Sequence, residues 1–336
     1  MTRHDTASGV VPATDQWFLH HGLTYFVPER RAHVRQALRP GRVLSFLVVM
    51  VVVATGAGGL VAWFADQLTL GPATLATLLV LAAVWYALVK LHAAPIVQWA
   101  LGRTFGSLRT LLPMTTRALP LLLLFITFLF ISTEVWQVFT NVSLGQLWLT
   151  VLLFVFIGVG FLLVRLPEEV DRTDDDVTDA MLLNACRGTP LAEDAERLVA
   201  DPDADPAAYA EVTGYERWNL VIVLMIVQSV QVLLVSLSVF VFLMVFGSLI
   251  MTEPVMQAWL GHDAHHLPHF QGVSRELLQV ATFLSAFSGL YLTVSTVTDE
   301  TYREQFFGDV MRELERAVGM RAVYLAVRER DRPAVG

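Results

Sequence analysis

The sequence predicts an all-α polytopic membrane protein with six transmembrane helices and cytoplasmic helical segments. Of its 336 residues, 55% are hydrophobic and 16% are charged, whereas a soluble domain carries about 25% charged residues. Charged residues are scarce because several runs of about 20 residues contain almost none. A run of this length crosses about 30 Å of hydrocarbon. Arginine is concentrated in alternate segments between these runs, as in the cytoplasmic loops of membrane proteins.

Six long apolar runs are predicted to be the spans, four without a charged residue and two with one each, Lys90 and Glu134. A soluble core helix of similar length would show a polar face. The runs cover residues 43–64, 73–99, 118–138, 146–164, 219–250 and 277–298. Pro72 stands directly before the second run, where a proline suits the first helical turn. The first four runs are closely coupled and a long polar segment separates them from the last two, so the spans group as four plus two.

The distribution of arginine predicts the orientation of the spans. Of the 22 arginines, 21 fall in segments on one side of the predicted membrane, and only Arg275 falls on the other. Because arginine-rich loops stay in the cytoplasm, both termini are expected there. The predicted location is the cell membrane. The preference for arginine over lysine is typical of a GC-rich genome and indicates a bacterial inner membrane.

These boundaries divide the chain into five regions. They are a basic cytoplasmic segment (1–42), the first four spans (43–166), an acidic cytoplasmic segment (167–217), the last two spans with an outer histidine-rich loop at 252–273 (218–298), and an amphipathic cytoplasmic tail (299–336). The acidic segment holds 15 carboxylates against 4 arginines. It is therefore the electrostatic opposite of the N-terminal segment.

Short helices are also expected outside the spans. In the acidic segment, Thr173, Thr189 and Asp205 are expected to begin three helices, because such side chains cap helix N-termini. The tail is predicted to continue the sixth span as a helix, with an apolar seam of Phe307, Val310, Leu314, Ala317 and Tyr324. Gly319 is expected to end that helix, which would allow a strand over 322–327. Two roles are open for this seam: packing against the rest of its own chain, or association with a second copy of the chain.

Five arginines form a basic stretch directly before the first span. They are Arg30, Arg31, Arg35, Arg39 and Arg42. Two interpretations remain open. The stretch lies on anionic lipid, to which each arginine contributes about 1 kcal/mol near the surface, or it docks onto the acidic segment of the same or a neighbouring subunit. Lys90, the single lysine, lies at the cytoplasmic end of the second span, where its stem can snorkel to the interface.

Polar side chains within the last two spans are candidates for a pore lining, because such residues are costly at membrane depth unless partnered or hydrated. They are Gln228, Gln231 and Ser238 in the fifth span and Thr282, Ser285, Ser288 and Ser295 in the sixth. Facing each other, they would form a polar seam through the membrane. The alternative is helix packing, in which small hydroxyl residues allow close approach and amides bond across helices.

The outer loop gathers four imidazoles and a carboxylate within eight residues. The candidates for metal binding or pH sensing are His262, Asp263, His265, His266 and His269. Zinc or a similar inorganic ion would suit these donors, although the spacing matches no established metal motif. The histidines would equally respond to external pH, or carry no special role.

Several function classes are disfavoured by the sequence. The single cysteine, Cys186, excludes an intramolecular disulfide and a cysteine-based metal cluster. Nucleotide-binding and hydrolase motifs are missing, so we expect no enzyme, no cofactor and no nucleic-acid partner. The sequence favours a homo-oligomeric ion channel or pore in the lipid bilayer, with the fifth and sixth spans near its axis. The alternative is a non-conducting membrane scaffold or regulator that acts through its cytoplasmic segments.

Overall fold

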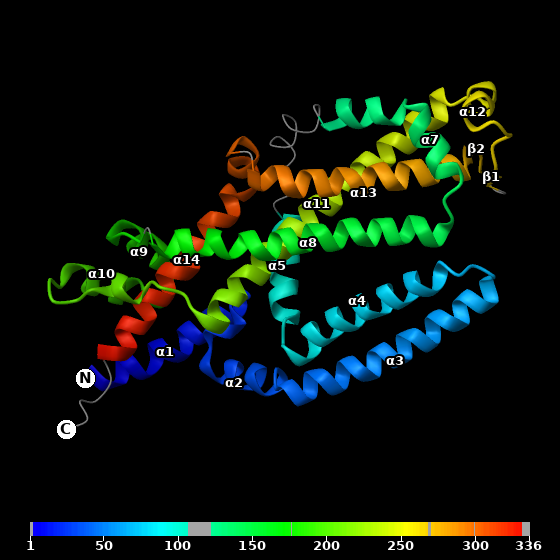
Figure 1. Cartoon of the computed structure of the whole chain (residues 1–336). Coiled ribbons are helices and arrows are strands. Elements are labelled where there is room, and N and C mark those ends of the chain that lie inside the picture. Colours follow the sequence, from blue (N-terminus) through cyan, green and yellow to red (C-terminus); the bar gives the residue numbers. More distant parts are fainter. Residues whose placement is uncertain (1–2, 107–121, 176, 268–269, 299, 331–336) are drawn as a thin grey trace.

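The computed structural model describes residues 3–106, 122–175, 177–267, 270–298 and 300–330. This part of the chain is almost entirely α-helical, and a bundle of long helices lies between two smaller groups of elements (Figure 1).

The first group, which we call the terminal domain, lies at the end of the bundle where both termini are found (Figure 1). It consists of α1 (Arg3–His20), η1 (Thr24–Phe26), α9 (Asp179–Cys186), α10 (Ala192–Ala200), η2 (Pro206–Tyr209), the first turns of α11 (Gly214–Ile250) and the second half of α14 (Glu300–Arg330). The short helix α2 (Pro28–Ala37) leads from this domain into the bundle.

The second group, which we call the hairpin end, lies at the opposite end of the bundle (Figure 1). It consists of α7 (Thr133–Thr140), α12 (Glu253–Leu260) and an antiparallel pair of short strands, β1 (His266–Leu267) and β2 (Phe270–Ser274).

Within the described residues, five helices are long and apolar enough to cross a membrane. They are α3 (Pro40–Ala65), α4 (Leu70–Lys90), α8 (Leu144–Asp175), α11 (Gly214–Ile250) and α13 (Arg275–Thr298). A sixth candidate is the helix Leu122–Phe130 together with α7, if the two count as one span that is bent by 65°. The beginning of the predicted run 118–138 lies outside the described residues.

The predicted single span over 73–99 is wrong in its last third. The helix α4 ends at Lys90, and α5 (Ala94–Gly106) starts in a new direction after a break that includes His92 at φ 53°. Pro95 explains the break, because it has no N–H to donate to the carbonyl of Leu91 one turn earlier. That carbonyl instead accepts a hydrogen bond from the hydroxyl of Tyr25 (2.7 Å).

The bend before α7 is the second departure from a straight span. The carbonyl of Phe130, which the bend releases from the helical ladder, accepts a hydrogen bond from the indole N–H of Trp136 (2.7 Å). Trp136 is fully buried. A side chain that replaces a ladder hydrogen bond is a recognised cause of a sharp helix bend.

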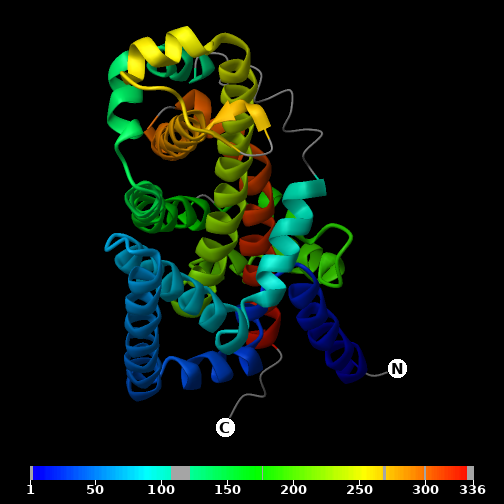
Figure 2. The same cartoon turned by 90° about the vertical axis from the view of Figure 1, so that its right-hand side faces the viewer.

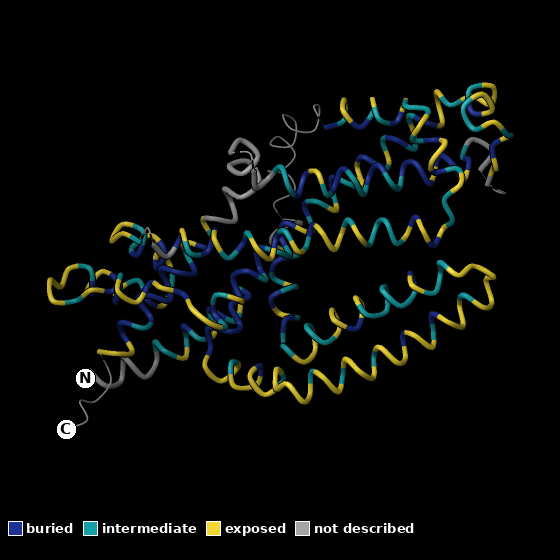
Figure 3. The backbone as a smooth tube through the Cα atoms, viewed as in Figure 1, coloured by how far each residue is buried: buried dark blue, intermediate teal, exposed yellow. Residues whose placement is uncertain are grey.

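The long helices differ in how much of their surface the chain itself covers. Seen along the bundle, α13 lies among its neighbours whereas α3 lies at the periphery and packs on α4 (Figure 2). Of the most apolar stretch of each helix, 56% is buried in α13 and 11% in α3. A Cβ at Gly58 would stand 2.6 Å from the carbonyl oxygen of Gly71, so α3 and α4 approach closely at this point. Figure 3 shows exposed residues along α3, α4, α8 and α11. Many of these residues are large and apolar.

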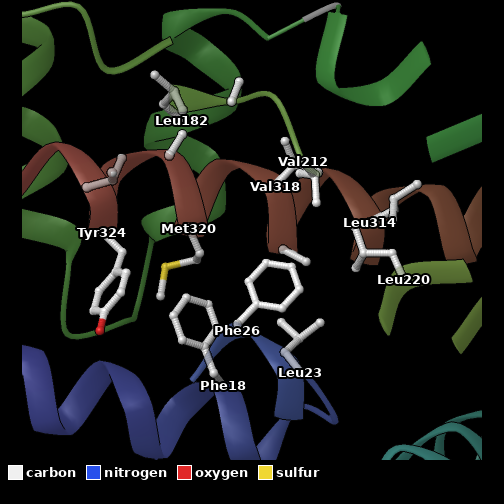
Figure 4. Packing of buried hydrophobic residues seen from close by; sticks show 14 of the residues in the cluster. Phe18, Leu23, Phe26, Leu182, Val212, Leu220, Leu314, Val318, Met320 and Tyr324 are labelled. Atoms are coloured by element: carbon white, nitrogen blue, oxygen red, sulfur yellow. The ribbon is translucent and has the colours of Figure 1, made fainter. Parts of the chain in front are cut away.

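One hydrophobic core holds the terminal domain together. Figure 4 shows Phe18 and Phe26 from the N-terminal segment packed against Met320 of α14, whereas Val318 and Leu182 of α9 lie on the opposite side of that helix. All five side chains are buried. Segments from the start, the middle and the end of the chain therefore share this core.

The tail differs from its prediction. The helix α14 runs without interruption from Glu300 to Arg330, so Gly319 does not end it and the strand over 322–327 is wrong. A Cβ at Gly319 would lie 2.6 Å from the Cβ of Ala185, which shows that this glycine allows α14 to approach α9. Residue 299, at the junction with α13, lies outside the described residues.

The acidic segment contains three short helices, but their starts differ in part from the prediction. The helix α8 continues to Asp175, and Thr178 rather than Thr173 caps α9 by accepting the N–H of Met181 (3.3 Å). Near Thr189, α10 begins only at Ala192. Asp205 caps η2 through the N–H of Ala208 (3.2 Å), and this single turn ends before α11.

Cys186 provides a reporter of this core. It is fully buried, and burial raises the pKa of its thiol to about 12 although the positive charge of Arg316 acts in the opposite direction. Because the thiolate is the reactive form, we expect a maleimide to label Cys186 at least about 100-fold more slowly in the folded protein than in SDS. Equal labelling rates in the two states would contradict the packing of α9 against α14.

Candidate functional site

Asn219, near the start of α11, holds the N-terminal segment in place. Its Oδ1 accepts a hydrogen bond from the backbone N–H of Tyr25 (2.9 Å), and its Nδ2 donates to the carbonyl oxygen of Gly22 (3.0 Å). Asn219 is fully buried. Gly22 has a φ of 70°, and a Cβ there would lie 3.0 Å from the Cβ of Trp99, so both its backbone conformation and its surroundings favour glycine.

Glu216, about one turn before Asn219, lies between two arginines. Its Oε2 accepts a hydrogen bond from Nε of Arg321 (2.5 Å), and its Oε1 is 2.9 Å from Nη1 of Arg31. Arg321 also donates from Nη1 to the carbonyl oxygen of Tyr209 (2.7 Å). The exposed fraction of the side chain is 5% for Glu216, 10% for Arg321 and 32% for Arg31. The triad joins the N-terminal segment, the acidic segment and the tail.

The five basic residues of the N-terminal segment separate into two groups. Arg31 points to Glu216 and so contacts the end of the acidic segment of its own chain. The other four are exposed, and in the described part of the chain none of them pairs with a carboxylate: Arg30, Arg35, Arg39 and Arg42. Arg42 donates to the backbone carbonyl of Gln36 (3.2 Å). Docking onto the acidic segment of the same chain is thus seen for Arg31, and lipid contact of the other four stays a prediction.

The polar residues of α13 lie mainly inside the bundle. Ser285 and Ser288 are buried, and their hydroxyl groups donate to carbonyl oxygens of the same helix, those of Thr282 (2.9 Å) and Ser285 (2.7 Å). Thr282 and Ser295 are partly exposed. Hydroxyl groups that bond to their own helix need no water, so this arrangement is typical of close helix packing.

The polar residues of α11 do not share one environment. Gln228 and Gln231 are buried, whereas Ser238 is exposed and donates to the carbonyl oxygen of Leu234 (2.8 Å). A residue that the sequence analysis missed, Ser236, lies against Gly289 of α13 where a Cβ at that glycine would collide with its hydroxyl. The contact between α11 and α13 therefore depends on small residues on both helices.

At the hairpin end, two histidines pair with carboxylates. Nδ1 of His265 is 2.7 Å from Oε1 of Glu276, and the backbone N–H of His265 donates to Oε2 of the same carboxylate (3.2 Å). Nε2 of His266 is 3.0 Å from Oε2 of Glu253. The sequence did not point to Glu253 or Glu276, because both stand apart from the cluster of histidines at 262–269 and each lies at the start of a helix.

The remaining members of the histidine loop make local contacts. Nδ1 of His262 is 2.7 Å from the carbonyl oxygen of Asp263, and the carboxylate of Asp263 accepts from Nε2 of Gln257 (3.0 Å). His269 lies outside the described residues. Among the residues that are described, no group of three or more His, Cys, Asp or Glu side chains is arranged to hold a metal ion. The geometry gives the metal interpretation no support here.

Comparison of the chain with protein-family models, with curated proteins and with solved structures gives no match. The functional argument therefore rests on the geometry of the terminal domain, the bundle and the hairpin end.

Proposed function

We propose that the chain is a polytopic protein of the cell membrane, with six spans and both termini in the cytoplasm of a bacterial cell. The spans would be α3, α4, the bent pair that ends with α7, α8, α11 and α13. The exposed apolar side chains of α3, α4, α8 and α11 support this proposal, because a belt of such extent would be costly in water. The arginine distribution supports a cytoplasmic terminal domain.

Within the membrane, we propose that the protein acts as a non-conducting scaffold or regulator through its terminal domain. The observation that carries this choice is the shared core of Figure 4, in which three separate cytoplasmic segments build one folded unit. The polar groups of the bundle favour the same choice, because Ser285 and Ser288 are buried and bonded to their own helix.

The experiment that tests the scaffold is capture of partners from native membranes by cross-linking to the terminal domain. Glu196, Asp201 and Asp203 are exposed on α10 and directly after it. The variant Glu196→Gln, Asp201→Asn, Asp203→Asn is therefore expected to leave the fold intact. Loss of a captured protein in this variant would support recognition by the acidic surface. An unchanged set of captured proteins would contradict a role for that surface.

A homo-oligomeric pore is the second candidate, and the exposure of Ser238 on α11 favours it. Subunits that met along this face of α11 would bring Ser238 to a common axis. The test is the current across a planar bilayer that holds Ser238→Cys, because the buried Cys186 gives little background reaction. Block of the current by a charged thiol reagent would support the pore, and Leu60→Cys on exposed α3 is the control. A silent bilayer with folded protein would support the scaffold.

A further inference from the structure

The four exposed arginines of the N-terminal segment lie where the polar part of the molecule meets the apolar bundle. Arg30 and Arg35 belong to α2, and Arg39 and Arg42 stand where α3 begins. Exposed apolar side chains start directly after them: Leu44 is 63% exposed and Leu47 53%. The basic surface is thus continuous with the apolar surface of α3.

Lys90 joins this surface from another part of the chain. It is exposed and is the last residue of α4, whose end lies next to the junction of α2 and α3 in both views (Figures 1 and 2). Tyr86, one turn earlier, donates a hydrogen bond to the carbonyl oxygen of Ala37 at the end of α2 (2.7 Å). The rings of His33 and His92 are 6.1 Å apart across the same junction.

The positive charges of this surface outnumber the carboxylate beside them, that of Glu29 in the first turn of α2. Within the described residues, the four arginines make no ion pair, in contrast to Arg31, whose guanidinium is held by Glu216. The ligand must therefore be anionic. Because the surface continues into exposed Leu44 and Leu47, a ligand that carries both an anion and hydrocarbon chains fits it better than a soluble anion or an acidic peptide.

We propose that Arg30, Arg35, Arg39, Arg42 and Lys90 form a binding surface for anionic phospholipid headgroups of the cytoplasmic leaflet. The inference rests on the proposed membrane location and names a partner for it. Guanidinium groups bind phosphate oxygens through paired hydrogen bonds, and Lys90 adds a point charge on a flexible stem. Arg31 is excluded from the surface and instead fixes α2 to the terminal domain.

The test is equilibrium binding of fluorescent phosphatidylglycerol to the detergent-solubilised full chain, with phosphatidylcholine carrying the same fluorophore as the reference. We expect at least about tenfold tighter binding of phosphatidylglycerol at about 0.1 M NaCl, and loss of this preference at about 1 M, where the Debye length falls from about 10 to about 3 Å. The variant Arg30→Gln, Arg35→Gln, Arg39→Gln, Arg42→Gln is expected to bind the two lipids equally.

A matched pair of single variants distinguishes binding at this surface from a general effect of lost positive charge. Arg39→Gln is expected to weaken phosphatidylglycerol binding about fivefold. Arg187→Gln removes another exposed arginine, in the terminal domain at the end of α9. This variant is expected to change the affinity for phosphatidylglycerol less than about twofold. Slow maleimide labelling of Cys186 in every variant confirms that the fold is retained.

Three results would overturn the proposal: an unchanged lipid preference in the fourfold variant, equal losses in the two single variants, or equally strong competition by soluble glycerol phosphate, which would indicate a site for a free anion. Failure of the proposed membrane location has a different signature. In that case the chain would be released from membranes by alkaline carbonate, whatever its headgroup preference.

Discussion

Replacement of Glu216 by alanine is expected to lower the free energy of unfolding of the terminal domain by about 3–5 kcal/mol. The variant leaves the guanidinium of Arg321 without its carboxylate in a place where 10% of that side chain is exposed. A buried charge that loses its partner has a large desolvation cost. Opening of the domain exposes Cys186, so its maleimide labelling is expected to accelerate by about two to three orders of magnitude, at about 1.4 kcal/mol for each factor of ten.

Two variants with more exposed ion pairs serve as references for this loss of stability. Arg31→Gln removes the more exposed partner of Glu216, and we expect it to cost about 1 kcal/mol. Glu193→Ala breaks an ion pair with Arg197 (2.8 Å) in which the Glu193 side chain is 85% exposed, and we expect less than about 0.5 kcal/mol. If Glu216→Ala destabilised the domain no more than Glu193→Ala, the triad would not stabilise the docking of the three segments.

Asn219→Leu is expected to release the N-terminal segment from α11 at a cost of about 2–4 kcal/mol. The substitution leaves the N–H of Tyr25 and the carbonyl of Gly22 buried without the partner that each has in Asn219. An unpaired buried backbone group costs about 1–3 kcal/mol. Hydrogen exchange at the amide of Tyr25 measures the release, and its rate is expected to rise at least about 30-fold.

Asn141→Leu is the matched control for this prediction. The side chain of Asn141 donates to the carbonyl oxygen of Gln137 (3.2 Å) at an exposed helix end, where water replaces a lost hydrogen bond. We expect a change within about 0.5 kcal/mol and no effect on Tyr25. Normal exchange at Tyr25 in Asn219→Leu would contradict the role assigned to Asn219.

The sequence predicted the apolar helices well because length and absence of charge are local properties. The two helix breaks were harder to predict, because at each one a side chain serves as the partner for a released backbone carbonyl. Pro95 is visible in the second run, but the proline alone did not show that Tyr25, far away in sequence, would bond to the carbonyl of Leu91. The bend after Phe130 has no proline at all and depends on the indole of Trp136.

The contacts of the terminal domain were missed for a related reason. Glu216 and Asn219 stand at the boundary of an apolar run, where a carboxylate and an amide also occur simply as helix-end residues. Only the fold brings Arg31 and Arg321 to Glu216 from opposite ends of the chain. The sequence predicts a helix end at Gly319, since glycine often has that role, whereas in the structure its missing side chain makes room for Ala185.

The central proposal is a membrane protein whose hairpin end faces outward and whose terminal domain faces the cytoplasm. The most direct test introduces one cysteine at a time into a Cys186→Ala background and labels intact cells with a membrane-impermeant maleimide. Gln67→Cys and Asn141→Cys lie at the hairpin-end turns of the bundle, and Arg187→Cys and Asp203→Cys in the terminal domain; all four positions are exposed. The proposal predicts labelling of the first two variants in intact cells and of the last two only after permeabilisation. Labelling of Arg187→Cys or Asp203→Cys in intact cells would contradict the proposal. Labelling of all four variants only after permeabilisation would contradict it as well.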